Sequence, residues 1–321
     1  MRIWLPLVSA IVAVLAGCGM PSLLITPVSS STDLKEEAIQ PGRGMFPDKI
    51  LLIELEGTIL NTRTGGLLQA KENDVSLITQ QLEKAANDPS VKVVVLRVNS
   101  PGGTVAASDT IYQEVLRFKK KTGRPVIAYG QDVMASGAYY VACAADQIMC
   151  QPTSIVGSVG VIFQSFDVSG TMNLIGVRST AIKSGPMKDM GSPFKPLGDE
   201  EKVVMQGMVD DFFHRFKGLV GTSRKLEGAR LDAVTDGRVF TGEKALAMGL
   251  VDRTGTLNDA LDLARQLGKT PDAEVVLYKR PYGYSGSIYA RAEQPAAQTL
   301  AVQLLPQATQ LPTGFYYLWN P

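Results

Sequence analysis

Residues 91–98 of the chain read Val-Lys-Val-Val-Val-Leu-Arg-Val, and Asn-Ser-Pro-Gly-Gly follows directly at residues 99–103. The first run is almost entirely apolar, which is typical of a strand that is buried on both faces of a parallel sheet. A helical pattern covers residues 106–121, and a second β-rich run covers residues 125–129. Strand, glycine turn, helix and strand in this order predict a parallel βαβ unit.

The same alternation extends toward both ends of the chain. Further strands are predicted at residues 49–55 and 147–151. Helical patterns occupy residues 73–87, 136–145, 169–175, 199–220, 242–248 and 257–267. The predicted fold class is therefore α/β, with a mainly parallel sheet flanked by helices. The sequence shows no internal repeat, so we expect one catalytic unit in each chain.

Composition narrows the classes of function. The chain has 321 residues, 45% of them hydrophobic, and a formal net charge of +1. That apolar content suffices for a packed core, and the near-neutral charge argues against a nucleic-acid partner. Three cysteines and one histidine are too few for a four-ligand zinc site if Cys18 has another role. We expect neither a metal nor an organic cofactor.

The amino terminus has the features of an export signal. Arg2 precedes an apolar run of about 14 residues, which is shorter than the ~20 that a membrane-spanning helix needs. The run ends in Leu-Ala-Gly-Cys at residues 15–18, which resembles a bacterial lipobox, so residues 1–17 are predicted to be a lipoprotein signal peptide. Cys18 would then carry the lipid that anchors the protein by its acyl chains. These features predict a protein of the bacterial cell envelope with its catalytic domain outside the cytoplasm; the choice between inner and outer membrane stays open.

The remainder of the chain divides into three parts. Residues 18–47 are rich in Pro, Ser, Thr and Gly and are predicted to be a tether, and residues 48–279 form the catalytic domain. Residues 280–321 show no clear period and are expected to be a peripheral C-terminal arm. In an exported protein Cys143 and Cys150 could pair, but their places in a helical pattern and at a strand end favour two separate buried thiols.

Two glycine-containing segments follow predicted strands and are candidates for chemistry. Gly102 and Gly103 place two unobstructed amides at a helix entrance, where an oxyanion can bind, although a simple connecting turn would have the same sequence. Ser136 lies among small residues just after the next strand, so its hydroxyl is a candidate nucleophile. The alternative is that Ser136 only caps the helix that follows.

A nucleophilic serine needs a base, and the one histidine is poorly suited to that role. His214 lies between aromatic residues in a predicted helix, so we interpret it as structural. Lys188 lies in the predicted loop at residues 184–196, and Lys183 directly precedes that loop. A lysine that is desolvated in a closed site can have its pKa lowered from ~10.4 toward ~7 to 8 and accept the hydroxyl proton. Ser-Lys pairs are a known variant of acyl-transfer catalysis.

Four motifs together resemble the signal peptide peptidase A family, peptidase family S49, of the ClpP and crotonase superfamily. They are Asn99 to Gly103, Ala135 to Tyr140, Gly157 to Gly160 and Lys183 to Asp189, in that order. The resemblance spans residues 49–268 and follows the short, unduplicated form. Two features depart from the family pattern: Ala138 replaces a second glycine, and a lipobox replaces a membrane-spanning helix.

The resemblance implies a fold of repeated ββα units and a serine endopeptidase that works through an acyl-enzyme. It implies Ser136 as nucleophile, Lys188 as general base with Lys183 as the alternate, and Gly102 and Gly103 in the oxyanion hole. Asp189 and Ser158 are candidates to orient the lysine. Substrates would be remnant signal peptides or unfolded envelope proteins, and the family forms tetramers or octamers, so a homo-oligomer is expected.

Three other interpretations remain at this point. An acyl-CoA enzyme of the crotonase type would share the fold, but an export signal argues against it. A non-catalytic, peptide-binding envelope scaffold would keep the fold without a base near Ser136. A lipid-anchored esterase would use the same two residues on ester substrates.

Overall fold

A computed structural model describes residues 33–61, 64–66, 69–71, 73–280 and 314–319 of the chain. The predicted signal peptide, Cys18, the first part of the tether and most of the C-terminal arm lie outside these residues. None of the helices in the described ranges is both long and apolar enough to cross a membrane.

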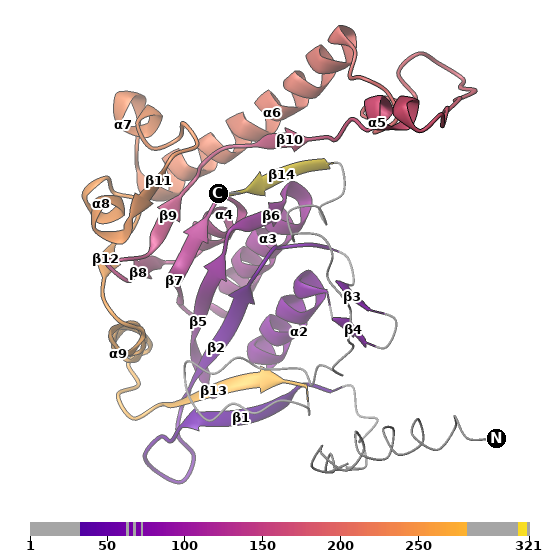
Figure 1. The fold of residues 1–321 in the computed structure, drawn as a ribbon. Coiled ribbons are helices and arrows are strands. Elements are labelled where there is room, and N and C mark those ends of the chain that lie inside the picture. Colours follow the sequence, from indigo (N-terminus) through magenta and orange to yellow (C-terminus); the bar gives the residue numbers. More distant parts are fainter. Residues whose placement is uncertain (1–32, 62–63, 67–68, 72, 281–313, 320–321) are drawn as a thin grey trace, which may run out of the picture. The chain divides into compact units, whose positions relative to one another are not determined.

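The main sheet confirms the parallel βαβ prediction (Figure 1). Within the described ranges, its strands run in the order β1, β13, β2, β5, β7, β8 and β12, with β9 pairing with β7 and β11 pairing with β9. The pairs from β13 to β12 are parallel, and β1 joins β13 antiparallel. The strand bounds are β1 Lys35–Gln40, β2 Lys49–Glu56, β5 Val91–Ser100, β7 Val126–Ala135, β8 Gln147–Cys150, β9 Ile155–Gly157, β11 Val239–Thr241, β12 Arg253–Thr254 and β13 Glu274–Lys279.

Helices pack on both faces of this sheet. Alternate residues of β2 face opposite sides: Leu51 and Ile53 belong to the apolar core that includes α2 and α3, while Ile50 and Leu52 pack with α9. Truncating one of these fully buried side chains to alanine would cost about 2–5 kcal/mol of folding stability. The helix bounds are α2 Asp74–Asn87, α3 Val105–Thr122, α4 Gly137–Ala142, α5 Ser169–Leu174, α6 Asp199–Arg224, α7 Gly228–Asp232, α8 Gly242–Ala247 and α9 Leu257–Gly268.

Strand β7 leads into the candidate site and pairs with two different strands along its length. Residues 127–130 pair with β8, and residues 133–135 pair with β9. The strand ends at Ala135, and α4 begins two residues later. The carboxyl ends of β5 and β7 therefore lie side by side, with the two glycine-containing segments directly after them.

A second sheet corrects the predicted C-terminal arm. Strand β14, Gly314–Leu318, lies between β6, Gly102–Thr104, and β10, Ile162–Gln164, and is antiparallel to both. Tyr317 is fully buried there. The described part of the arm is thus an internal strand and not peripheral. The lack of a clear period reflects a segment whose two neighbours come from distant parts of the chain.

The predicted tether also contains structure that its composition does not indicate. Strand β1 pairs with β13 and lies at one edge of the main sheet. Lys49 binds Glu36 and Asp88, which ties β1 to the body of the domain. A two-stranded hairpin, β3 Thr64–Gly66 and β4 Gln69–Lys71, is the remaining sheet among the described residues.

Candidate active site

Ser136 occupies a strained turn between β7 and α4. Its backbone has φ 54° and ψ −120°, a combination that residues other than glycine rarely adopt. Its amide donates to the carbonyl of Gly157 (2.7 Å), and its own carbonyl accepts from the amide of Tyr140 (2.9 Å). The side chain makes no capping bond, so the helix-cap interpretation is wrong. The predicted helix at residues 136–145 begins at Gly137 because this turn precedes it.

The hydroxyl of Ser136 is buried and lacks a hydrogen-bond partner. The residue is 1% exposed, and its Oγ contacts no donor or acceptor among the described residues. Burying a hydroxyl without a partner costs about 1–3 kcal/mol, so folded proteins rarely retain such a group without a function. Strained geometry and an unpaired hydroxyl at one residue are typical of a nucleophile.

The glycine segment lies directly against this turn. Gly102 has φ 99°, and its amide donates to Ser100 Oγ (3.1 Å), which in turn donates to the carbonyl of Gly57 (2.6 Å). A Cβ on Gly102 would come within 2.6 Å of the amide nitrogen of Gly137, and one on Gly137 within 3.2 Å of the amide nitrogen of Gly103. Only glycines allow this close approach. The structure therefore brings Gly102, Gly103 and Ser136 together as predicted.

Gly137 is a site residue that the sequence analysis did not identify. Its amide follows the nucleophile directly and lies against Gly102, while its Cα faces the amide of Gly103. The Ser-Gly pair at the start of a helix is a signal that could have identified it, because an amide in this position commonly completes an oxyanion hole. The amide of Gly102 is already bound to Ser100, so Gly103 and Gly137 are the better candidates for oxyanion donors.

An aromatic cluster forms the wall beside these glycines. The ring of Tyr140 lies 5.0 Å from that of Phe216 on α6 and 5.1 Å from that of Tyr317 on β14. The Tyr140 hydroxyl donates to Asp109 (2.7 Å), and Arg215 binds both groups. Burial and the hydrogen bond to Asp109 raise the pKa of Tyr140, so its hydroxyl stays protonated at neutral pH.

A cavity of about 380 Å³ is lined by Leu318, the residue after Tyr317, and by Phe213 of α6. It is also lined by Ser158 and by apolar side chains of the segment after β9, including Val159 and Ile162. Ser158 has φ 50° and donates its amide to the carbonyl of Arg238 (2.8 Å). Ser158 therefore lines the cavity, and its proposed role in orienting a lysine has no contact in support among the described residues.

The lysines lie in a separate part of the chain, which we term the lysine segment (residues 176–198). Lys183 binds Asp189 at 2.6 Å, and Lys195 binds both Asp189 (2.9 Å) and Glu201 (2.5 Å) at the start of α6. Hydrogen bonds from Lys183 and Lys195 lower the pKa of Asp189 to about 2. Asp189 thus holds Lys183, as expected of an orienting carboxylate, while Lys188 is exposed.

One chain does not bring either lysine to Ser136. Glu201 anchors the lysine segment at the first turn of α6, whereas Phe216 of the same helix contacts Tyr140, four residues after Ser136. Fifteen residues of α-helix separate Glu201 from Phe216, a rise of about 22 Å. Figure 1 shows α5 beside the start of α6, at the end away from α4.

The cysteines and the histidine do not take part in the site. Cys143 and Cys150 are both free and buried, which confirms the prediction of two separate thiols. Burial raises the pKa of Cys143 to about 12 and that of Cys150 to about 11. His214 lies on α6 with its ring 6.1 Å from that of Phe213.

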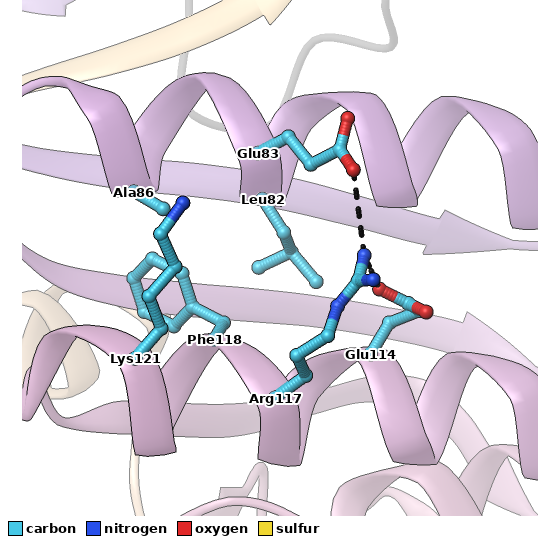
Figure 2. A pocket seen from close by; sticks show the side chains of 7 residues that line it. All are labelled: Leu82, Glu83, Ala86, Glu114, Arg117, Phe118 and Lys121. Carbon is cyan, nitrogen blue, oxygen red and sulfur yellow. Dashed lines mark hydrogen bonds and ion pairs between the residues drawn. The ribbon is translucent and has the colours of Figure 1, made fainter.

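A second pocket, of about 170 Å³, lies between α2 and α3 (Figure 2). Arg117 extends across it and forms ion pairs with Glu83 and Glu114. The pocket is at the C-terminal half of α3, whereas Ser108, in the N-terminal half, lies against Gly137. The residues that line the pocket include no serine, threonine or cysteine, Arg117 pairs with both glutamates, and Lys121 binds Asn87, so the pocket is not a candidate active site.

Comparisons with known proteins indicate the family of the chain. The family model described as "Peptidase family S49" matches residues 118–270. A candidate protease of Methanocaldococcus jannaschii is 38% identical over 66% of this chain and 68% of its own length. A candidate signal peptide peptidase SppA of Enterococcus faecium is 33% identical over 78% of this chain and 72% of its own.

Among solved structures, a mutant of ClpP1 from Listeria monocytogenes aligns with 65% of this chain and 94% of its own, with a TM-score of 0.42 and 17% identity. That likeness is too weak to support an argument about the site. The two sequence relatives, by contrast, are more than 30% identical to this chain, and the alignments cover more than two thirds of each relative's length. The chain therefore belongs to peptidase family S49, as a member of the signal peptide peptidase A family.

Proposed function

We propose that the protein is a serine endopeptidase whose nucleophile is Ser136 and whose general base is Lys188 of a second copy of the chain. The single observation that supports Ser136 as the nucleophile is its buried, unpaired Oγ on a strained turn beside the amides of Gly103 and Gly137. No other hydroxyl in the described ranges combines backbone strain, burial and a missing partner.

A second copy as the source of the base follows from the surface of the lysine segment. The segment and the neighbouring helix ends expose large apolar side chains, including Leu174 (88% exposed), Ile175 (71%) and Ile182 (101%). Exposed apolar side chains in one region mark a surface for another protein. Contact with a neighbouring chain would bury these side chains, desolvate the lysines beside them and supply the base that Ser136 lacks in its own chain.

The reaction that this arrangement supports is amide hydrolysis in two steps. The neutral lysine amine accepts the proton of Ser136 as Oγ bonds to the substrate carbonyl carbon, and the amides of Gly103 and Gly137 bind the resulting oxyanion. The carbon–nitrogen bond then breaks, and the departing amine takes the proton from the lysine. Water attacks the ester in the same way, which releases the acid and restores Ser136.

The substrates and the location are also proposals. Strand β14 pairs with β6 beside Gly103 as an extended strand, which supports a peptide or an unfolded segment as the substrate in preference to a folded domain. We place the enzyme in the bacterial envelope, anchored by lipid on Cys18, where remnant signal peptides and unfolded envelope proteins are available.

One observation favours a second candidate function. The lysine segment and Ser136 lie apart within one chain, and a strand occupies the groove, which also suits a peptide-binding scaffold without catalysis. The two functions differ in whether Ser136 forms an ester with a substrate.

The experiment that separates them is covalent trapping. We expect a β-lactone probe to acylate the intact protein once, on Ser136, as mapped by mass spectrometry of the digested chain. The Ser136→Ala variant should remain unlabelled, and Lys188→Ala should be labelled far more slowly than wild type. Lack of acylation in an assembled, folded preparation would contradict the peptidase, and loss of labelling in Lys183→Ala instead of Lys188→Ala would assign the base to Lys183.

A further inference from the structure

Four charged side chains tie the lysine segment to the start of α6, and we term them the ion-pair clamp (Lys183, Asp189, Lys195 and Glu201). Asp189 Oδ1 accepts hydrogen bonds from Lys183 (2.6 Å) and from Lys195 (2.9 Å). Lys195 also donates to Glu201, whose second carboxylate oxygen accepts from the amide of Gly198 (3.2 Å). Positive and negative groups thus alternate from the loop to the first turn of the helix.

The ion-pair clamp encloses the turn that carries Lys188. Lys183 Nζ donates to the carbonyl of Pro186 (3.1 Å), two residues before Lys188. The same amine donates to Asp189, the residue that follows Lys188. Within the turn, the amide of Lys188 donates to the carbonyl of Gly185 (3.2 Å). The backbone on both sides of Lys188 is therefore held in place, while its own side chain is exposed.

Lys183 and Lys188 differ in what their amines contact. The Lys183 amine donates to two acceptors of its own segment, so it is occupied within one chain. The Lys188 amine has no hydrogen bond or ion pair with any of the described residues, so it is available to a second chain. A general base needs an amine whose lone pair can face the hydroxyl. Lys188 meets this requirement, whereas Lys183 has the contacts of a supporting residue.

The far end of the ion-pair clamp is fixed in the body of the domain. The Glu201 side chain is only 7% exposed. The hydrogen bond from Lys195 lowers the pKa of Glu201, and hydrogen bonds from both lysines of the clamp lower the pKa of Asp189, so both carboxylates stay charged at neutral pH. The turn that carries Lys188 is therefore attached to the same helix whose Phe216 packs on the nucleophile side of the domain.

We propose that the ion-pair clamp positions Lys188 to accept the proton of Ser136 in a neighbouring copy of the chain. Lys183, Lys195 and Glu201 are positioning residues, and Lys183 is not the base. The inference rests on the proposed function. A misplacement of about 1 Å can lower a rate by roughly 100-fold, so a base on an exposed loop needs such a support. Exposed ion pairs add little to folding stability, so loss of the clamp should act mainly on kcat.

The first test uses arginine, which keeps the positive charge of lysine but stays protonated and cannot act as a base. Lys183→Arg should retain roughly a third or more of the wild-type kcat for peptide hydrolysis, because a guanidinium can still bind Asp189 and the Pro186 carbonyl. Lys183→Met removes both contacts and should lower kcat by about 10- to 100-fold. Lys188→Arg should lower kcat by about 10²- to 10⁴-fold, because the base itself is lost.

The second test removes the link between the loop and α6. Lys195→Met and Glu201→Gln should each lower kcat by about 10- to 100-fold and leave KM nearly unchanged, because neither residue lies on the nucleophile side of the domain. Glu201→Gln keeps an acceptor for the amide of Gly198, so the start of the helix is preserved. Lys195→Arg should restore most of kcat, since a guanidinium can bind two carboxylates. Lys202→Met is the matched control, because Lys202 lies in the same first turns of α6 and pairs with the exposed Asp199 (2.8 Å).

The outcomes separate this inference from the function on which it rests. All rates are measured on the fraction that has the wild-type size in gel filtration, so a defect in assembly is not counted as a defect in positioning. An inactive Lys183→Arg, a Lys195→Met as active as Lys202→Met, or a Lys195→Arg as slow as Lys195→Met would overturn the ion-pair clamp. If Lys188→Arg is inactive in the same experiment, the proposed peptidase and its base still stand. Full activity of Lys188→Arg would instead contradict the base of the proposed function.

Discussion

Helix α4 and helix α5 both have six residues, yet every residue of α4 is buried and none of α5 is. The first follows Ser136 in the centre of the domain, with β7, β9 and the glycine segment around it. The second leads into the lysine segment. The lysines of that segment form ion pairs with Asp189 and with Glu201 at the start of α6. In the site proposed above, one chain therefore completes the nucleophile half, formed by Ser136 and the glycine segment, and presents the lysine half on its surface.

This difference indicates what each half depends on. Strain at Ser136 is maintained by many surrounding contacts, so the nucleophile half should function as a rigid unit fixed by folding alone. The lysine segment has few buried side chains and exposes Val177, Ile182 and Phe194, so we expect its final geometry to depend on assembly. The predictions below test the two halves, beginning with the largest effect.

Removing the nucleophile should have the largest effect. We expect Ser136→Ala to lower kcat for peptide hydrolysis by roughly 10⁴- to 10⁶-fold, since the ester can no longer form. The melting temperature should stay the same or rise slightly, because the lost hydroxyl is buried without a partner. The exposed Ser76→Ala on α2 is the control for substitution itself. Activity that survives Ser136→Ala would remove the basis of the nucleophile half.

Disturbing the glycine segment should have the next largest effect. Gly102→Ala places a Cβ against Tyr317 and Gly137 at a positive φ, so we expect the oxyanion donors to shift and kcat to fall by about 10²- to 10³-fold. Gly123→Ala is a matched control, because Gly123 has φ 67° at the end of α3 with open space around it. In the Gly123→Ala control, steady-state kinetics should show an unchanged kcat. Urea unfolding of the same control should show a loss of folding stability of about 1–2 kcal/mol. Equal kcat in the two variants would argue that Gly102 has no part in catalysis.

The Asp109 carboxylate should link stability to pH. Burial raises its pKa, but hydrogen bonds from Arg215 and Tyr140 outweigh burial and give a net pKa below the usual value of 3.8. The stabilisation is therefore complete above about pH 4 and is lost as the pH falls through the lowered pKa of the folded state.

We expect urea unfolding to show a gap between wild type and Asp109→Asn at pH 6 that narrows toward pH 2. Solvent reaches this pair, so the gap should be about 1 kcal/mol or less. Asp262→Asn, which loses an exposed ion pair with Arg265, is the control. A gap that widens with acid would reverse the assigned sign.

The smallest expected effect is on the alkylation of the thiols of Cys143 and Cys150. Burial raises the pKa of Cys143 to about 12 and that of Cys150 to about 11, so little thiolate is present at pH 8. Iodoacetamide should leave both residues unmodified in the folded protein and modify both after unfolding in urea, as measured by mass spectrometry of each peptide. Rapid modification of either in the folded state would show that this part of the core opens.

The sequence predicted the parallel sheet and its helices well because periodicity and buried β-branched runs mark them locally. The strand predicted at residues 49–55 is Lys49–Glu56, and the helix predicted at 73–87 is Asp74–Asn87. The bounds differ most at Ser136, where the turn that matters for function breaks the helical pattern.

Features that depend on distant pairing were missed. Tyr317 lies opposite Gly103 although more than 200 residues separate them. The aromatic run at residues 315–319 favours a strand, but no local pattern indicates the strand with which it pairs. Strand β1 escaped prediction for the same reason, since β13 is its partner. The separation of Lys183 and Lys188 from Ser136 within one chain depends on how distant segments pack, which periodicity and residue type do not encode.

The most direct test of the divided site is complementation between two inactive chains. Ser136→Ala and Lys188→Ala chains are coexpressed with different tags, mixed assemblies are isolated through both tags, and peptide hydrolysis is measured. If one chain supplies the serine and its neighbour the lysine, random pairing restores roughly a quarter of wild-type activity, because that fraction of contacts joins two intact residues. Mixed assemblies that stay as inactive as either variant alone would contradict a site shared between chains.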